Sequence, residues 1–76
     1  MEELIESRPE IMLGKPVVCG TRITVQLIVE ALAAGETIEQ LLESYPNLER
    51  AGVLSALRYA ARAVAVQPPG VLIPAT

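Results

Sequence analysis

The chain has 76 residues, of which 51% are hydrophobic, and it carries a net charge of −3 with one cysteine and no histidine. A chain of this length forms one domain. The single cysteine excludes an internal disulfide, and the lack of histidine argues against a metal site of soft ligands and against the commonest general base of enzymes. Because so small a domain has a thin core, we predict that its apolar excess is buried by pairing with a second copy.

The N-terminal stretch, MEELIESRPE, is acidic. A signal peptide starts with basic residues and continues with an apolar segment, which is not the pattern here. The longest apolar run is also far shorter than the ~20 residues that cross a bilayer. Together with the low cysteine content, which is typical of a reducing compartment, these features predict a cytoplasmic protein without a membrane segment.

Residues 1–24 are predicted to form an N-terminal arm and a β-hairpin. In MLGKPVVCGTRIT, the turn residues Gly14 and Lys15 separate two short apolar runs, 11–13 and 16–18, which we expect to pair as strands. A lone hairpin is marginally stable and leaves an edge that can pair with another chain. We therefore predict that this hairpin forms a homodimer or docks a partner protein through Ile11, Leu13, Val17 and Val18.

Residues 25–66 are predicted to form a three-helix unit. Its first helix covers 25–34, begins after the capping residue Thr24 and ends at Gly35. Nearly all of its sides are apolar, so we expect it to lie at the centre of the domain.

The second predicted helix covers residues 37–45. Thr37 and Gln40 have the spacing of a capping box, and Pro46 prevents the helix from continuing. Residues 36–49 carry four acids and no base, whereas residues 50–76 carry three arginines and no acid. The acids of this helix are interpreted as a solvated face.

The third predicted helix covers residues 50–66. Gly52 lies in its first turn, where glycine costs about 1 kcal/mol relative to alanine, so Gly52→Ala is expected to stabilise the protein by about 0.5 to 1 kcal/mol. At about 100° per residue, the inner face consists of Val53, Leu57, Ala60 and Val64. The opposite, exposed face then carries Ser55, Arg58 and Arg62.

Residues 67–76 are predicted to form an extended tail. The tail begins with the turn residues Pro68-Pro69-Gly70 and contains an apolar triplet. Extended apolar segments pair readily with partner surfaces, although chain termini are also commonly disordered. The candidate partner-binding residues of the tail are Val71, Leu72 and Ile73.

Three motifs occur in a particular order within residues 9–61: GKPVVCGTRITV, LIVEALAAGETIEQLLESYPNL and ALRYAA. In this order they resemble a bacterial family of small domains, the domain-of-unknown-function family 433. The resemblance implies an α+β, mainly α fold, in which a β-hairpin precedes a homeodomain-like helix-turn-helix unit. Because such domains often occur beside PIN-like nucleases, it also implies an antitoxin that pairs with such a toxin. The chain departs from the usual family pattern at Thr24, Glu49 and Gly52.

An enzyme is the least supported class of function. Cys19 has no imidazole to activate it and is expected to be a small buried apolar residue. The acids of the second helix are expected to be exposed, whereas carboxylate pairs with perturbed pKa values need burial. We predict a protein without catalytic residues or cofactor.

Two functions from different classes remain open. The first is DNA binding by the basic third helix, with Arg50 as a candidate base contact, Arg58 and Arg62 as phosphate contacts, and Ser55 on the same face. The second is a dimeric adaptor that does not bind DNA and engages a partner protein through the hairpin and the tail. The two are compatible in an antitoxin that represses its own operon with one surface and binds its toxin with another.

Overall fold

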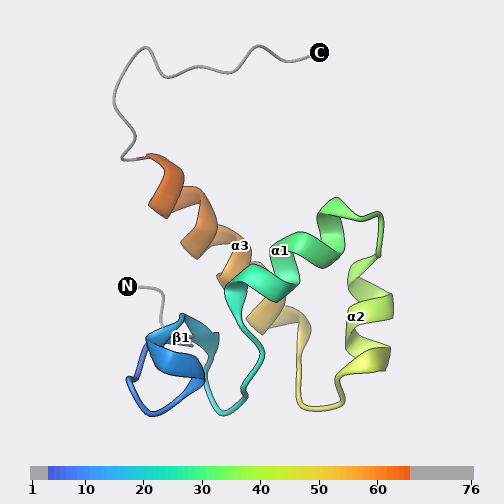
Figure 1. Cartoon of the computed structure of the whole chain (residues 1–76). Helices are drawn as coiled ribbons and strands as arrows, with labels where there is room; N and C mark the ends of the chain where they lie inside the picture. Colours follow the sequence, from blue (N-terminus) through green and yellow to red (C-terminus); the bar gives the residue numbers. More distant parts are fainter. Residues whose placement is uncertain (1–3, 66–76) are drawn as a thin grey trace.

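The structure, a computed structural model, describes residues 4–65 of the chain (Figure 1). Two short strands precede three helices, so the predicted α+β, mainly α fold class is confirmed. The elements in chain order are β1 (Ile5–Glu6), a 3₁₀ turn (Met12–Gly14), β2 (Val17–Val18), α1 (Val25–Ala33), α2 (Ile38–Ser44) and α3 (Arg50–Ala65). Among the described residues, no helix has both the length and the apolar character needed to span a membrane.

The strand pair uses a different first strand from the one predicted. β1 pairs with β2 in antiparallel register, Ile5 opposite Val18 and Glu6 opposite Val17. The prediction of a strand at 11–13 is therefore wrong. This segment instead makes a tight turn, in which the amide of Gly14 donates to the carbonyl of Ile11 over 3.0 Å.

β2 is bonded along both of its edges, to β1 on one side and to residues 23–24 on the other. Beyond β1, Val17 forms an antiparallel bridge with Thr24, and the amide of Val18 donates to the carbonyl of Ile23 over 3.0 Å. Val17 is 0% exposed and Val18 is 6% exposed. Both side chains belong to the core, so neither is exposed in the single chain for the predicted dimer or partner interface. Cys19, predicted to be buried, is exposed.

The first two helices begin as their capping residues predict. The Leu27 amide donates to Thr24 Oγ1 over 2.9 Å at the start of α1. In α2 the capping box is complete, since the Gln40 amide donates to Thr37 Oγ1 over 3.1 Å and the Thr37 amide donates to Gln40 Oε1 over 2.8 Å. These bonds satisfy backbone donors that a helix start otherwise leaves without an intrahelical acceptor.

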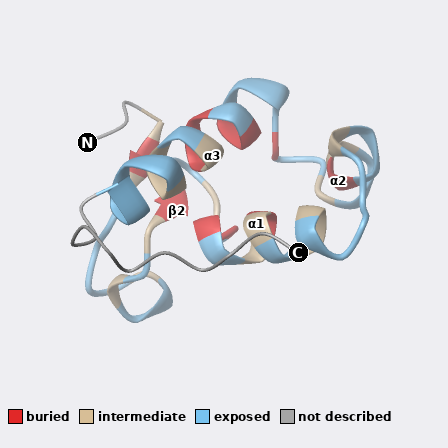
Figure 2. Cartoon of the chain, turned by 90° about the horizontal axis from the view of Figure 1, so that it is seen from above, coloured by how far each residue is buried: buried red, intermediate tan, exposed pale blue. Residues whose placement is uncertain are grey.

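The core forms where α3 packs against α1 and the strand pair, and α2 closes one end (Figures 1 and 2). Its buried apolar side chains come from all five of these elements and from the segments between them. They are Ile5, Val17, Val18, Ile23, Val25, Ile28, Leu41, Leu48, Val53 and Ala56. The buried positions of α3 fall in its first half, and its last turns are exposed (Figure 2).

The buried face of α3 is rotated from the predicted one. Val64, assigned to the inner face, is 59% exposed, whereas Ser55, assigned to the outer face, is 2% exposed. The buried residues of the helix are Gly52, Val53, Ser55 and Ala56. These small residues let the helix approach the strand pair closely: a Cβ at position 52 would lie 2.9 Å from Val18 Cγ1.

Candidate functional site

The exposed side of α3 carries two arginines that lie one turn apart. Arg58 and Arg62 are separated by four residues and both are exposed, so their side chains share one face of the helix. Residues 50–65 contain no acid, and Arg62 lies in the last turn, where a cation is favoured by the helix dipole. This face can offer two guanidinium groups to an anionic partner such as a phosphate backbone.

Ser55 does not belong to that exposed face, which corrects its predicted role as a DNA contact. Its hydroxyl is buried and accepts a hydrogen bond from Arg58 Nη2 over 3.3 Å. The serine therefore contacts the arginine rather than a partner. Through this hydrogen bond, Ser55 helps to hold the Arg58 guanidinium in place.

Arg50, predicted as a base contact, is engaged within the protein. Its Nη2 atom lies 2.5 Å from Glu39 Oε2, and the two side chains are 52% and 71% exposed. The ion pair joins the first turn of α3 to the first turn of α2. The Arg50 side chain, which donates a hydrogen bond to the carboxylate, lowers the pKa of Glu39 below its ordinary value, and a backbone hydrogen bond acts in the same direction.

The acids of α2 and its flanks limit the surface that could face DNA. Glu36, Glu39 and Glu43 are all exposed. In helix-turn-helix proteins the helix before the recognition helix crosses the phosphate backbone, where these carboxylates would be repelled. The candidate nucleic-acid interface is therefore limited to the Arg58 and Arg62 face of α3.

The Glu39–Arg50 pair predicts a pH dependence of stability. Because the pKa of Glu39 is lowered on folding from 4.5, the unfolded chain binds more protons than the folded one as the pH falls below that value. The pair thus stabilises the fold above about pH 4.5, and this contribution is lost as the pH falls through the folded-state pKa. We expect the urea midpoint to drop more between pH 5.5 and about pH 3 in the wild type than in Glu39→Gln.

Arg50→Gln removes the same ion pair and is expected to reproduce the flatter pH profile of Glu39→Gln. High salt should shrink the difference between wild type and both variants, because the pair is solvent-exposed. Identical urea midpoints for wild type and Glu39→Gln across this pH range would show that the pair does not contribute to stability in solution.

A second surface is formed by the 3₁₀ turn between the strands. Leu13 is 93% exposed and Met12 is 40% exposed. Both residues have positive φ angles, 58° for Leu13 and 49° for Met12, a conformation that costs roughly 1–2 kcal/mol for each residue that is not glycine. The turn thus holds a large apolar side chain in water at an energetic cost. Ile11, the neighbouring predicted contact, is half-buried.

The remaining predicted partner-binding residues, Val71, Leu72 and Ile73, lie outside residues 4–65. Within that range, no group of three or more Cys, Asp or Glu side chains is placed to hold a metal ion. The ion-pair role of Glu39 was not predicted, and the spacing of eleven residues to Arg50 gave no local signal of it.

Comparisons with known proteins agree with this architecture. Residues 5–60 match the family model described as Protein of unknown function (DUF433). The chain is 40% identical over 58 residues to the uncharacterized protein y4eO of Sinorhizobium fredii, a match that covers 76% of this chain and 26% of that protein. A crystal structure of a DUF433 member protein from Anabaena variabilis superposes with a TM-score of 0.77 at 26% identity and covers 82% of this chain and 61% of that chain. The chain thus spans about a quarter of the curated relative and less than two thirds of the solved chain.

Proposed function

The chain belongs to the DUF433 family, and from this premise we propose that it is an antitoxin-like, DNA-binding protein of the cytoplasm. In this proposal it pairs with a PIN-like nuclease toxin and represses the operon that encodes both. The nuclease partner follows from the family resemblance of the motifs. The observation that supports DNA binding is the pair of exposed arginines, Arg58 and Arg62, on a helix without acids.

The geometry favours phosphate contacts over base contacts. Arg58 and Arg62 lie in the middle and at the end of α3, whereas base-reading residues usually lie near the start of a recognition helix. Arg50, at the start, is paired with Glu39, and the exposed face of α3 carries no asparagine or glutamine to read adenine. Phosphate contacts position a protein on DNA but carry no sequence information.

The salt dependence of DNA binding tests this proposal. Each phosphate that a protein neutralises adds about 0.9 to the slope of log K against log salt concentration. Arg58→Ala is therefore expected to lower that slope by about 0.9 in a monomer and about 1.8 in a dimer. The loss of affinity should be nearly equal on the promoter duplex and on a random duplex, as measured by titration at several salt concentrations.

Arg22→Ala is the matched control, because it removes the same charge from an exposed position before α1. It should leave the slope close to that of the wild type. Arg50→Ala should change the slope by less than about 0.9, since the Arg50 guanidinium is paired with Glu39. Binding that is unchanged in both Arg58→Ala and Arg62→Ala would refute the role of α3 in DNA binding.

The second candidate function is the dimeric adaptor that does not bind DNA, and the exposed turn at Leu13 favours it. An apolar residue that is 93% exposed on a strained turn resembles the anchor residues that fill a pocket of a partner. The sequence assigned this role in the hairpin to Ile11, Leu13, Val17 and Val18 together, and in the tail to Val71, Leu72 and Ile73. Of the hairpin residues, Leu13 has the most exposed side chain.

Sedimentation velocity at micromolar concentration tests the adaptor and the homodimer together. If Leu13 is the anchor, Leu13→Asp should convert a dimer to a monomer without loss of helical signal. Leu54→Asp, at an apolar position of α3 that is 40% exposed, adds the same charge elsewhere and should leave the dimer intact. A wild-type protein that sediments as a monomer would remove the homodimer from the proposal.

A further inference from the structure

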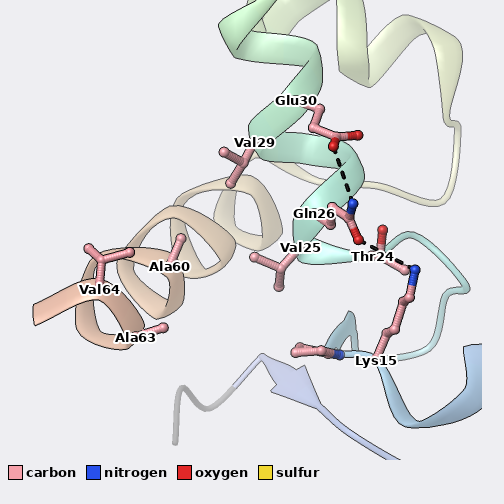
Figure 3. Close-up of a pocket in the computed structure, with 10 residues that line it drawn as sticks. Lys15, Thr24, Val25, Gln26, Val29, Glu30, Ala60, Ala63 and Val64 are labelled. Carbon is pink, nitrogen blue, oxygen red and sulfur yellow. Dashed lines mark hydrogen bonds between the residues drawn. The ribbon is translucent and has the colours of Figure 1, made fainter. Parts of the chain in front are cut away.

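A groove of about 420 Å³ runs between α1 and the last turns of α3 (Figure 3). Val25 and Val29 of α1 line one side, and Ala60, Ala63 and Val64 of α3 line the other. Its volume falls in the range of roughly 300–1,000 Å³ that is typical of ligand pockets. These small apolar side chains leave a surface that can contact other apolar side chains closely.

The polar groups at the rim of the groove already bond to one another. Lys15 Nζ donates to Gln26 Oε1 over 3.4 Å, and Gln26 Nε2 donates to Glu30 Oε2 over 3.2 Å. Figure 3 shows this ladder along α1, beside the valines. Because one base, one amide and one acid share these bonds, the rim has no surplus charge. The groove is therefore suited to an uncharged apolar segment rather than to a phosphate or another ion.

The segment that follows α3 has this chemistry. The described part of α3 ends at Ala65, and Ala63 and Val64 just before it line the groove. Residues 66–76 read VQPPGVLIPAT and contain no charged side chain. The Pro68-Pro69-Gly70 sequence favours a reversal of the chain, after which Val71, Leu72 and Ile73 come as three consecutive apolar residues.

The lengths allow the segment to return to the groove. Residues 66–70 can span at most about 17 Å when extended. The α3 wall from Ala60 to Val64 is only about 6 Å long, at 1.5 Å per residue. A reversal of the chain at 68–70 would leave 71–73 within reach of this wall. Because the segment is tethered at the mouth of the groove, its effective concentration there is high.

We propose that residues 71–73 of the chain occupy the α1–α3 groove of the same molecule. The apolar side chains of the segment then cover the exposed Val64 and the half-buried Val29 and Ala60. This contact does not rest on the proposed function, because it requires neither DNA nor a nuclease.

Nuclear magnetic resonance on the full chain tests the proposal. If 71–73 occupy the groove, methyl–methyl NOEs should join Leu72 or Ile73 to Val29 or Ala60. The backbone order parameters of 71–73 should lie near the value of about 0.85 that is typical of rigid backbone. Leu72→Asp, which places a charge in the apolar groove, should reduce them below about 0.6. Thr76→Asp adds the same charge outside the triplet and should leave them unchanged.

A change in the groove itself provides the reciprocal test. Ala63 is exposed, so Ala63→Glu leaves the core intact, and it should release 71–73 just as Leu72→Asp does. Order parameters below about 0.6 in the wild type, or values unaffected by Ala63→Glu, would overturn the proposal. A sample that mixes labelled and unlabelled chains separates the sources of the NOEs. NOEs that appear only between molecules would show that a second copy fills the groove and would also overturn it.

Discussion

Val17→Asp is expected to leave the protein unfolded at 25 °C. Val17 is 0% exposed, and it pairs with Glu6 of β1 on one side and with Thr24 on the other. An unpaired carboxylate at this position would lose several kcal/mol of solvation with no cation to compensate for it. Because a domain of this size has a total stability of about 5 kcal/mol, we expect loss of the helical signal at 222 nm and of a cooperative urea transition.

Leu13→Asp is the matched control for this experiment. It makes the same chemical change four residues earlier, at a side chain that is 93% exposed. It should keep its helical signal and a cooperative urea transition, since a carboxylate at this exposed position stays hydrated. A folded Val17→Asp protein that had lost only its dimer would restore the interface role that the sequence suggested for Val17.

Gly52→Ala is expected to destabilise the protein by about 1 kcal/mol, which reverses the expectation from the sequence. Alanine gains about 1 kcal/mol in a helix interior. However, its Cβ would lie 2.9 Å from Val18 Cγ1, and Val18 is buried and stiff at χ1 because it is β-branched. Overpacking of this kind typically costs about 1–3 kcal/mol. Urea denaturation of wild type and variant would measure the difference.

Removing the Val18 side chain, which causes the clash, allows a sharper test. In a Val18→Ala background the Cγ atoms are gone, and the next contact of the new Cβ is Leu48 Cδ1 at an ordinary 3.5 Å. Gly52→Ala should then stabilise the protein by up to about 1 kcal/mol. This change of sign between the two backgrounds is the coupling expected of residues in contact. A stabilising Gly52→Ala in the wild-type background would mean that β2 moves away from α3 at little cost.

Interactions between residues close in the chain are predictable from the sequence because their spacing alone determines them. The cap Thr24 and the box of Thr37 and Gln40 join residues three positions apart. Such bonds depend on helix geometry and not on the rest of the fold. The order of the elements, the bounds of the first two helices and the fold class follow from these local signals, and the family is identified from the motifs.

Contacts between distant residues needed the tertiary structure. The partner of β2 lies at Ile5–Glu6, in a stretch whose acidic residues carry no clear strand pattern. The sequence therefore favours the nearer apolar run at 11–13 as the partner strand. The Glu39–Arg50 pair likewise joins two helices. Helical periodicity indicates that one face of a helix is buried. A hydrophobicity pattern then assigns the largest apolar side chains to that face, which is not the face that packs in α3.

The orientation of α3 shows why that pattern was insufficient. Close packing of the helix on β2 requires small residues, and it selects Gly52, Ser55 and Ala56 for the buried face. Local sequence signals are enough to predict a third, basic helix near residues 50–66. They do not predict which of its sides is exposed, because the distance between α3 and β2 depends on Val18, which is far from α3 in the chain. That contact buries Ser55, turns Val64 outward, and leaves Arg58 and Arg62 exposed.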